Sequence, residues 1–170
     1  LANTPRSSFE AVRGVIEKDL GTPLADVFRD FDQTPLASAS IGQVHRAVLL
    51  DGTEVAVKVQ HPGVAQAVES DLANAGLVEG AISMMGGAKT MQSKAVLEEI
   101  RQRFREELDY TLEAERQRAF AVLHDADPHV RVPRVFDAHV RPRVLVTEFV
   151  RGRSFDEARE GTDAERRAWA

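Results

Sequence analysis

The sequence predicts an α+β domain, in which an antiparallel sheet of about five strands is combined with long helices. Two observations predict the sheet. Three valines alternate with other residues between Glu54 and Gln60, as expected for a strand with one apolar face. The preceding Asp51-Gly52 pair is a strong signal for a two-residue hairpin turn, so residues 43–50 are predicted to form the partner strand. A third observation, apolar residues at helical spacing on both sides of this hairpin, predicts the helices.

The first helix is predicted over residues 7–20. Ser7 and Glu10 have the three-residue spacing of a capping box, and Gly21 is a natural stop. The apolar residues of the segment fall on one helical face, which is expected to pack on the rest of the domain. Residues 1–31 are therefore interpreted as an N-terminal helical extension.

The remaining elements are predicted from the same periodicities and from turn residues. In order, they are a short helical piece over 24–28, a first strand over 31–38, the hairpin over 43–60, a helix over about 64–84 ended by Gly86-Gly87, one long helix over about 93–123, a loop over 125–129, two strands over 130–140 and 143–150 with Arg141-Pro142 between them, and a final helix over 154–170.

Composition limits the number of domains and the kinds of partner and metal site that the chain can have. The 170 residues suffice for one domain with a core. The formal net charge of −5 argues against nucleic acid as a partner. The chain has no cysteine, which excludes disulfides and thiolate metal sites, and its five histidines show no metal-ligand spacing.

Targeting signals are also missing from the sequence. The N-terminal residues lack the basic and apolar regions of a signal peptide, and no run approaches the roughly 18 apolar residues of a membrane span. A cytoplasmic location is therefore expected. The first residue is not methionine, so the chain is expected to be a piece of a longer protein.

Lys58 is the first candidate functional residue. It lies on the face of the predicted strand opposite the valines, where a desolvated ammonium group needs an anion or a carboxylate beside it. The ordinary alternative for an isolated lysine is a solvated position on the outer face of a sheet.

The spacing around Lys58 resembles that of protein kinases. Those proteins carry a G-x-G-x-x-G-x-V loop over the nucleotide phosphates, followed by a V-A-I-K strand. Here residues 55–58 read V-A-V-K, and the run P-L-A-S-A-S-I-G-Q-V-H-R-A covers residues 35–47. The alanine-rich loop resembles the UbiB/AarF family of atypical kinase-like proteins in particular. The three glycine positions and the valine are taken by Ala37, Ala39, Gly42 and Val44.

The resemblance implies a protein-kinase-like N-lobe over residues 32–150, with a helical insertion over about 62–92, a hinge, and the start of a second lobe over 151–170. It implies ATP or ADP as the ligand, with magnesium whose ligands belong to the second lobe. Thr147 takes the gatekeeper position, and the adenine edge is expected to meet the main chain of Glu148 and Val150. The expected nucleotide-binding residues are Ala37, Ser38, Ala39, Ser40, Ile41, Gly42, Val44, Ala56, Lys58, Thr147, Glu148 and Val150.

Three carboxylates on the predicted long helix are candidate partners for Lys58. They are Glu107, Asp109 and Glu113, and helical spacing leaves both glutamates open because each lies near an apolar seam. A charged helix flank held by neighbouring arginines is the plain alternative for each carboxylate. The resemblance assigns Glu107 and Asp109 to a separate acidic motif. It leaves Glu113 as the pairing glutamate, so that Lys58 and Glu113 are the expected catalytic residues and Glu107 is the second choice.

By resemblance, the parent protein is expected to be an atypical kinase or ATPase that supports isoprenoid-quinone lipid metabolism, with a lipid or membrane surface as a further partner and a location at the membrane periphery. One alternative is a pseudokinase-like regulatory or scaffold module without phosphotransfer. Another is a helical interaction domain unrelated to nucleotides. No HRD-like, DFG-like or K-x-G-Q run occurs in the sequence, so this chain alone is expected to be inactive.

Overall fold

The computed structural model describes residues 6–84, 90–152, 159 and 162. The predicted Gly86-Gly87 stop and, apart from two positions, the predicted final helix lie outside these residues. The elements follow in the order α1 (Phe9–Leu20), the 3₁₀ helix η1 (Leu24–Asp26), β1 (Phe28–Phe31), β2 (Ala37–Ser38), β3 (Gly42–Leu49), β4 (Glu54–Gln60), α2 (Val64–Met84), α3 (Thr90–Glu107), α4 (Tyr110–Leu123), the 3₁₀ helix η2 (Asp137–His139) and β5 (Val144–Glu148).

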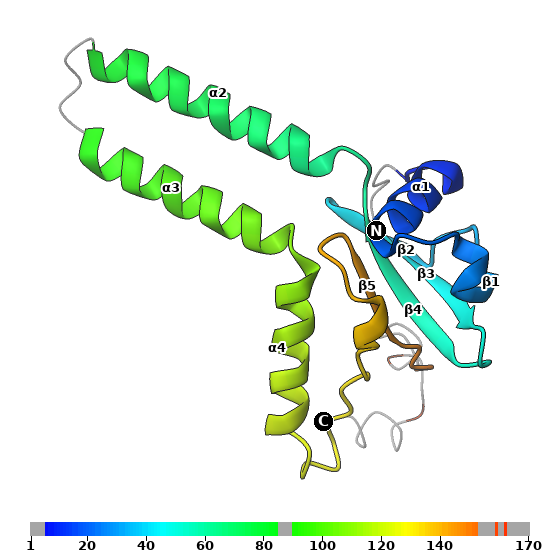
Figure 1. Ribbon diagram of the computed structural model, residues 1–170. Coiled ribbons are helices and arrows are strands. Elements are labelled where there is room, and N and C mark those ends of the chain that lie inside the picture. The colour runs from blue at the N-terminus through cyan, green and yellow to red at the C-terminus, as the bar shows by residue number, and fades with distance from the viewer. Residues whose placement is uncertain (1–5, 85–89, 153–158, 160–161, 163–170) are drawn as a thin grey trace.

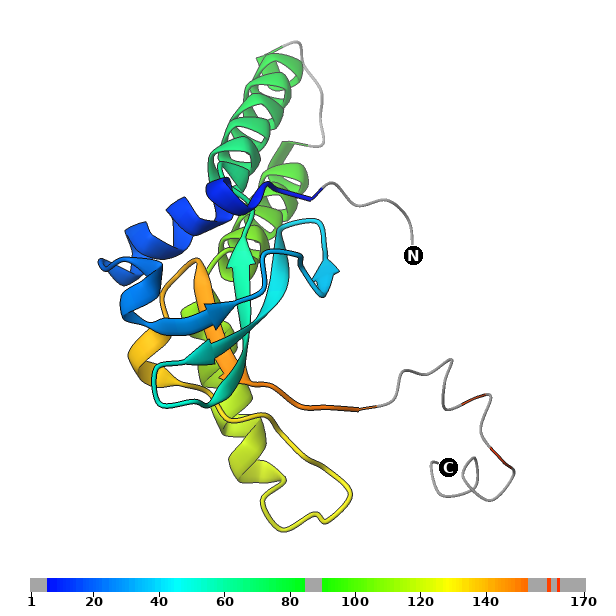
Figure 2. The same cartoon turned by 90° about the vertical axis from the view of Figure 1, so that its right-hand side faces the viewer.

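Five strands form one antiparallel sheet in the described part of the chain. The order is β1-β3-β4-β5, and the two-residue β2 also pairs with β3. This confirms the predicted α+β class and the number of strands. Helices α1 and α4 lie on opposite sides of the sheet, and α2 and α3 project from one end of it as an antiparallel pair (Figures 1 and 2).

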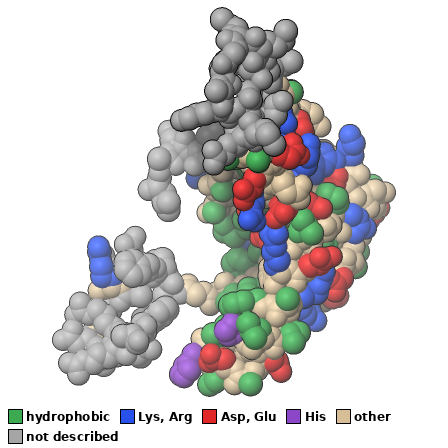
Figure 3. Space-filling view, turned by 90° about the vertical axis from the view of Figure 1, so that its left-hand side faces the viewer, with side chains coloured by type: hydrophobic (Ala, Val, Ile, Leu, Met, Phe, Trp, Pro, Cys, Tyr) green, Lys and Arg blue, Asp and Glu red, His purple; other side chains and the backbone are tan. Residues whose placement is uncertain are grey.

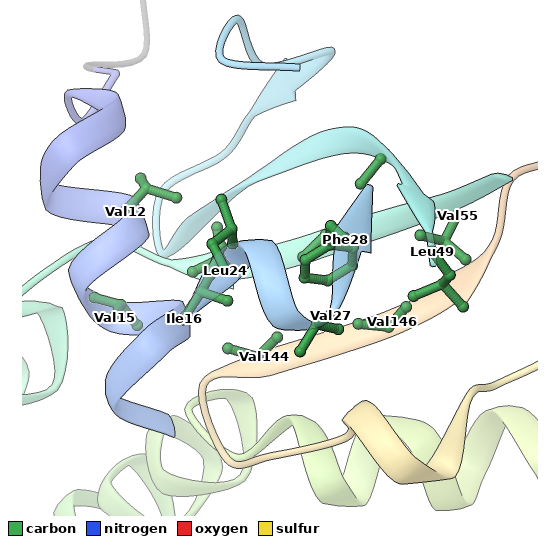
Figure 4. Close-up of a cluster of buried hydrophobic side chains, with 13 residues drawn as sticks. Val12, Val15, Ile16, Leu24, Val27, Phe28, Leu49, Val55, Val144 and Val146 are labelled. Carbon is green, nitrogen blue, oxygen red and sulfur yellow. The ribbon is translucent and has the colours of Figure 1, made fainter. Parts of the chain in front are cut away.

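The main core lies between α1 and the sheet. The three alternating valines of β4 are completely buried there, which confirms the apolar face predicted for this strand. Valines of β5 flank them in the neighbouring strand, and apolar residues of α1 belong to the same cluster (Figure 4). The buried members of this core are Val12, Val15, Ile16, Leu24, Val27, Phe28, Ala47, Leu49, Val55, Val57, Val59, Val144 and Val146.

Helix α1 begins two residues later than predicted, and its N-cap lies one residue later. Ser8 is the N-cap, and its hydroxyl accepts a hydrogen bond from the N–H of Ala11 at 3.3 Å. Ser7 is not the cap, because its hydroxyl contacts Nδ1 of His61 at 2.8 Å and its N–H donates to the side chain of Gln43 in β3 at 3.0 Å. The predicted stop is confirmed, since Gly21 has φ 74° and its N–H donates to a carbonyl of the last turn.

The β3–β4 hairpin has a longer turn than the predicted two residues. Leu49 donates its N–H to the carbonyl of Thr53 at 2.9 Å, which leaves three residues in the loop. The Asp51 carboxylate accepts the N–H of Thr53, and Gly52 takes φ 90° at the end of the loop. This combination of an Asx turn and a left-handed glycine accounts for the extra residue.

Three further predictions about elements were wrong. The strand predicted over 31–38 is divided into β1 and β2, because Pro35 has no N–H to donate. The strand predicted over 130–140 is reduced to an isolated bridge from Val135 to Thr147 followed by η2, and Pro133 again interrupts the ladder. The helical piece predicted over 24–28 is the 3₁₀ helix η1, and it ends at Asp26 because β1 begins at Phe28.

The predicted long helix is broken into α3 and α4. Asp109 lies between them with φ −119° and ψ 96°, which are not helical angles. Its carboxylate accepts hydrogen bonds from the N–H of Thr111 at 3.0 Å and from the Thr111 hydroxyl at 2.6 Å, so Asp109 is the N-cap of α4. The break turns α4 along the sheet while α3 continues beside α2 (Figure 1).

A buried polar chain lies beside the core. The amide of Gln43 contacts Nε2 of His45 at 2.8 Å, and Nδ1 of His45 contacts the carbonyl of Asp32 at 2.7 Å. The carbonyl can only accept, so Nδ1 carries the hydrogen and Nε2 accepts from the amide. Burial lowers the pKa of His45, and the neutral imidazole is the form that this network holds.

We therefore expect the free energy of unfolding to decrease as the pH falls below about 6.5, where histidine in the unfolded chain begins to bind protons. The folded chain resists protonation of His45, so the unfolded state takes up more protons in this range. Urea unfolding at pH 7.5 and pH 5.5 measures the decrease. The decrease should be smaller in His45→Gln, which does not titrate.

Burial also lowers the pKa of His139, so the contribution of His45 is the difference between the wild-type chain and the variant. The exposed His129 provides the control substitution, His129→Gln. An equal loss of stability in wild-type and His45→Gln chains would contradict the prediction.

Candidate functional site

Lys58 extends from the face of β4 opposite the valines. Its Nζ lies 2.6 Å from Oε2 and 2.9 Å from Oε1 of Glu113, which lies in the first turn of α4. The predicted pairing with Glu113 is confirmed, and the second choice, Glu107, is wrong. The two side chains keep 33% and 43% of their surface exposed, so both remain accessible to a ligand.

Tyr110 completes the surroundings of Lys58, and the sequence offered no specific signal for it. The Nζ atom of Lys58 lies 4.5 Å from the centre of the tyrosine ring, which places the cation over the ring face. Burial, followed by the charges of Glu113 and Glu107, raises the pKa of Tyr110. The phenol therefore stays neutral beside the ion pair.

Gly42 is the one glycine of the alanine-rich loop, and its neighbours explain why. A Cβ atom at this position would lie 2.5 Å from the carbonyl oxygen of Val59 and 2.7 Å from the hydroxyl of Tyr110. Both distances are too short for a Cβ atom. The Val59 oxygen cannot easily move aside, because it belongs to the main chain of the sheet. Tyr110 thus packs directly under the loop because residue 42 has no side chain.

The alanine-rich loop and Lys58 line one cavity of about 370 Å³, a volume within the range of small-molecule sites. The structure therefore brings together eight of the predicted nucleotide-binding residues. Two residues of α3 complete the lining. The full set is Ala37, Ser38, Ala39, Ser40, Ile41, Gly42, Val44, Lys58, Phe104 and Glu107.

The two members of the predicted acidic motif have different surroundings. Glu107 lines the cavity that Lys58 also lines, whereas Asp109 is engaged as the N-cap of α4.

A separate groove of about 390 Å³ lies along α3 and shares Phe104 and Glu107 with the cavity beside Lys58. Acidic, basic and hydrophobic side chains are interspersed on the face of the molecule seen in Figure 3.

Ala56 and Thr147, two of the residues predicted to surround adenine, lie two residues along the sheet from Lys58. Ala56 pairs with Thr147 in the β4–β5 register, and Val44 pairs with Lys58 in the β3–β4 register. Paired residues project from the same face of a sheet, so these positions share the face of Lys58. Ala56 and Thr147 do not line the 370 Å³ cavity.

Glu148 and Val150 are also absent from the cavity lining. The carboxylate of Glu148 pairs with Arg131 and accepts the N–H of Arg134 at 3.3 Å, and these contacts hold its pKa below the usual range. The side chain of Glu148 is therefore occupied. The main-chain N–H of Glu148 also donates, to the carbonyl of Arg134 at 2.8 Å, so the predicted contact with adenine can use only its main-chain carbonyl.

The described residues contain neither a metal-ligand cluster nor a helix suited to span a membrane. No group of three or more histidine, aspartate or glutamate side chains there is arranged to hold a metal ion. None of the helices formed by these residues combines the length and apolar character needed to cross a bilayer.

Comparison with known proteins agrees with this geometry. The family described as "ABC1 atypical kinase-like domain" matches residues 2–168. The chain is 40% identical over 144 residues to the mitochondrial atypical kinase COQ8B of Rattus norvegicus, covering 84% of this chain and 27% of that protein. It is 43% identical over 138 residues to the mitochondrial atypical kinase coq-8 of Caenorhabditis elegans, covering 80% of this chain and 18% of that protein. The chain thus spans less than a third of either relative.

Among solved structures, the complex of Rv3197 with erythromycin from Mycobacterium tuberculosis has a TM-score of 0.80 and 39% identity, and the match covers 95% of this chain and 41% of that chain. The antiparallel sheet with its lysine strand and the helix that carries the pairing glutamate is a protein-kinase-like N-lobe. The chain belongs to the ABC1 family of atypical kinase-like domains, the UbiB/AarF family that its alanine-rich loop resembles.

Proposed function

We propose that this chain is the nucleotide-binding N-lobe of an atypical kinase or ATPase of the UbiB/AarF type. The observation that carries the proposal is the Lys58–Glu113 ion pair, because Lys58 also lines the cavity under the alanine-rich loop. In kinases, an ammonium group held by a helix glutamate binds the nucleotide phosphates. This placement supports the catalytic roles predicted for Lys58 and Glu113.

In this proposal, the phosphates of ATP or ADP lie between the loop and Lys58. The main chain of the loop and the side chains of Ser38 and Ser40 supply polar groups along the lining. Glu113 holds the ammonium group of Lys58 in place. The base packs against Val44, Ala56 and Thr147, with its edge toward the main chain of Glu148 and Val150.

The magnesium ion that accompanies ATP in this family neutralises phosphate charge when it is bound. The described residues offer no cluster for it, so we assign its ligands to the second lobe of the longer parent protein. For the parent we propose a role in isoprenoid-quinone lipid metabolism, a cytoplasmic location and peripheral contact with a lipid or membrane surface. Nucleic acid is not proposed as a partner.

One observation favours the alternative of a pseudokinase-like regulatory module. Glu107 lines the same cavity as Lys58, and a carboxylate close to the phosphates repels them. A module that holds nucleotide weakly, without transferring phosphate, would tolerate this repulsion.

Nucleotide binding by this chain tests the proposal directly. We expect Lys58→Ala to weaken binding of a fluorescent ADP analogue by roughly 10-fold or more, because a charge-assisted hydrogen bond is lost. Glu113→Gln should cause a smaller loss, since Lys58 keeps its charge but loses its orientation. Lys18→Ala, an exposed lysine at the end of α1, is the matched control. Equal affinities of the wild-type and Lys58→Ala chains would refute the proposal.

A second prediction concerns turnover. We expect the isolated chain to release no phosphate from ATP in the presence of magnesium, because the described residues lack a metal-ligand cluster and the sequence lacks HRD-like and DFG-like runs. A phosphate-release assay measures this. A rate above that of a Lys58→Ala sample would show that the lobe is active alone.

A third prediction concerns Ala39 in the full-length parent. Alanine restricts the backbone more than glycine does, so Ala39→Gly enlarges the set of conformations open to the loop. We expect this substitution to change the affinity for ATP relative to ADP. Titration of both nucleotides into both proteins measures the change, and identical isotherms would count against a role of the loop in phosphate binding.

A further inference from the structure

His61 uses both ring nitrogens to join two separate segments of the chain. It follows β4 directly, and its Nε2 lies 3.0 Å from the carbonyl oxygen of Ala39 in the alanine-rich loop. Its Nδ1 lies 2.8 Å from the hydroxyl of Ser7, just before α1. Its main-chain N–H also donates to the carbonyl of Ile41 at 2.9 Å.

The chemistry of these partners fixes the proton on the ring. A carbonyl oxygen accepts only, so Nε2 donates its hydrogen to Ala39. In the neutral imidazole, Nδ1 then accepts from the hydroxyl of Ser7. The contact with Ser7 therefore favours the tautomer that bonds to the loop.

The crest of the loop has few other restraints. Ala39 and Ser40 are exposed, and the main-chain bond from Ala39 N–H to Gly42 C=O at 2.8 Å closes the turn on itself. The bond from His61 connects this exposed crest to the sheet. Ser7 adds a second link, because its N–H donates to the buried side chain of Gln43 at the base of the loop.

We propose that His61 is a positioning residue that holds the alanine-rich loop in one conformation, and that Ser7 supports it, so that nucleotide affinity depends on the segment before α1. The nucleotide part of this inference rests on the proposed function, whereas the effect on the loop does not. A loop already held in its binding conformation loses less entropy when a ligand binds. His61 thus strengthens phosphate binding although it lies outside the lining of the phosphate cavity.

The test compares wild-type chain with His61→Ala, His61→Gln and Ser7→Ala. Hydrogen exchange of residues 36–42 without nucleotide reports on the loop, and titration of a fluorescent ADP analogue reports on binding. His61→Ala should speed exchange in the loop and weaken ADP binding by roughly 2- to 10-fold, the effect of one hydrogen bond. His61→Gln should restore most of both, because its amide can donate to the Ala39 carbonyl. Ser7→Ala should have a smaller effect in the same direction.

Two control variants separate this role from general loss of stability. Ser8→Ala removes the N-cap of α1 without removing a contact to the loop, and His129→Ala removes an exposed histidine elsewhere. Neither should change exchange in the loop or ADP affinity. Thermal unfolding of each variant identifies any chain that fails to fold. If His61→Ala fails to fold, the loop exchange and ADP affinity of His61→Gln and Ser7→Ala test the inference.

The outcomes also separate this inference from the proposed function. Faster loop exchange in His61→Ala, with no ADP binding by any chain, supports the positioning role and overturns the proposed function. Unchanged loop exchange in His61→Ala, with ADP bound by the wild-type chain, overturns the inference and leaves the proposed function standing. Equal effects of His61→Ala and His61→Gln also overturn the inference, since the restored donor would then be irrelevant.

Discussion

The side-chain amide of Gln60 determines how the helices turn back to the sheet. It donates to the carbonyl of Leu108 at 2.6 Å, at the break between α3 and α4, and to the carbonyl of Pro142 at 3.2 Å. Gln60 and Lys58 lie on the same face of β4, about 7 Å apart along the strand. Leu108 lies just before the N-cap Asp109, and Glu113 lies in the first turn of α4. The two contacts therefore hold the start of α4 at two points along β4 and bring Glu113 to Lys58.

The two faces of β4 contribute differently to the stability of the lobe and to ligand binding. Each completely buried valine contributes about 1.5 kcal/mol or more from removal of apolar surface from water. The Lys58–Glu113 pair is more than one-third exposed on average, and pairs of this kind contribute about 0–1 kcal/mol. The apolar face therefore provides the stability of the lobe. The ion pair positions an ammonium group, and its loss is expected to affect ligand binding far more than folding.

The sequence predicted those features that depend on neighbouring residues in the chain. Alternation identified β4 and its apolar face, and α2 begins at Val64, as expected after the Pro62-Gly63 break. The resemblance, rather than helical spacing, selected Glu113 over Glu107. The helix break escaped prediction because the segment around Asp109 continues a helical pattern. The break is stabilised by the N-cap of Asp109 and also by a bond from Gln60, 48 residues away. Tyr110 was missed for the same reason, since its contacts with Lys58 and Gly42 are entirely tertiary.

The alanine-rich loop shows why two of the three glycines of the kinase pattern are dispensable here. None of the described non-glycine residues has a positive φ, so Ala37 and Ala39 occupy backbone conformations open to any residue. Gly42 does not have a positive φ either, and it is required only because Val59 and Tyr110 leave no space for a Cβ atom. Replacing glycine by alanine at a compatible position stabilises a chain by about 0.4–1 kcal/mol through its unfolded state. The loop therefore gains rigidity at its two alanines without strain and keeps glycine only where packing demands it.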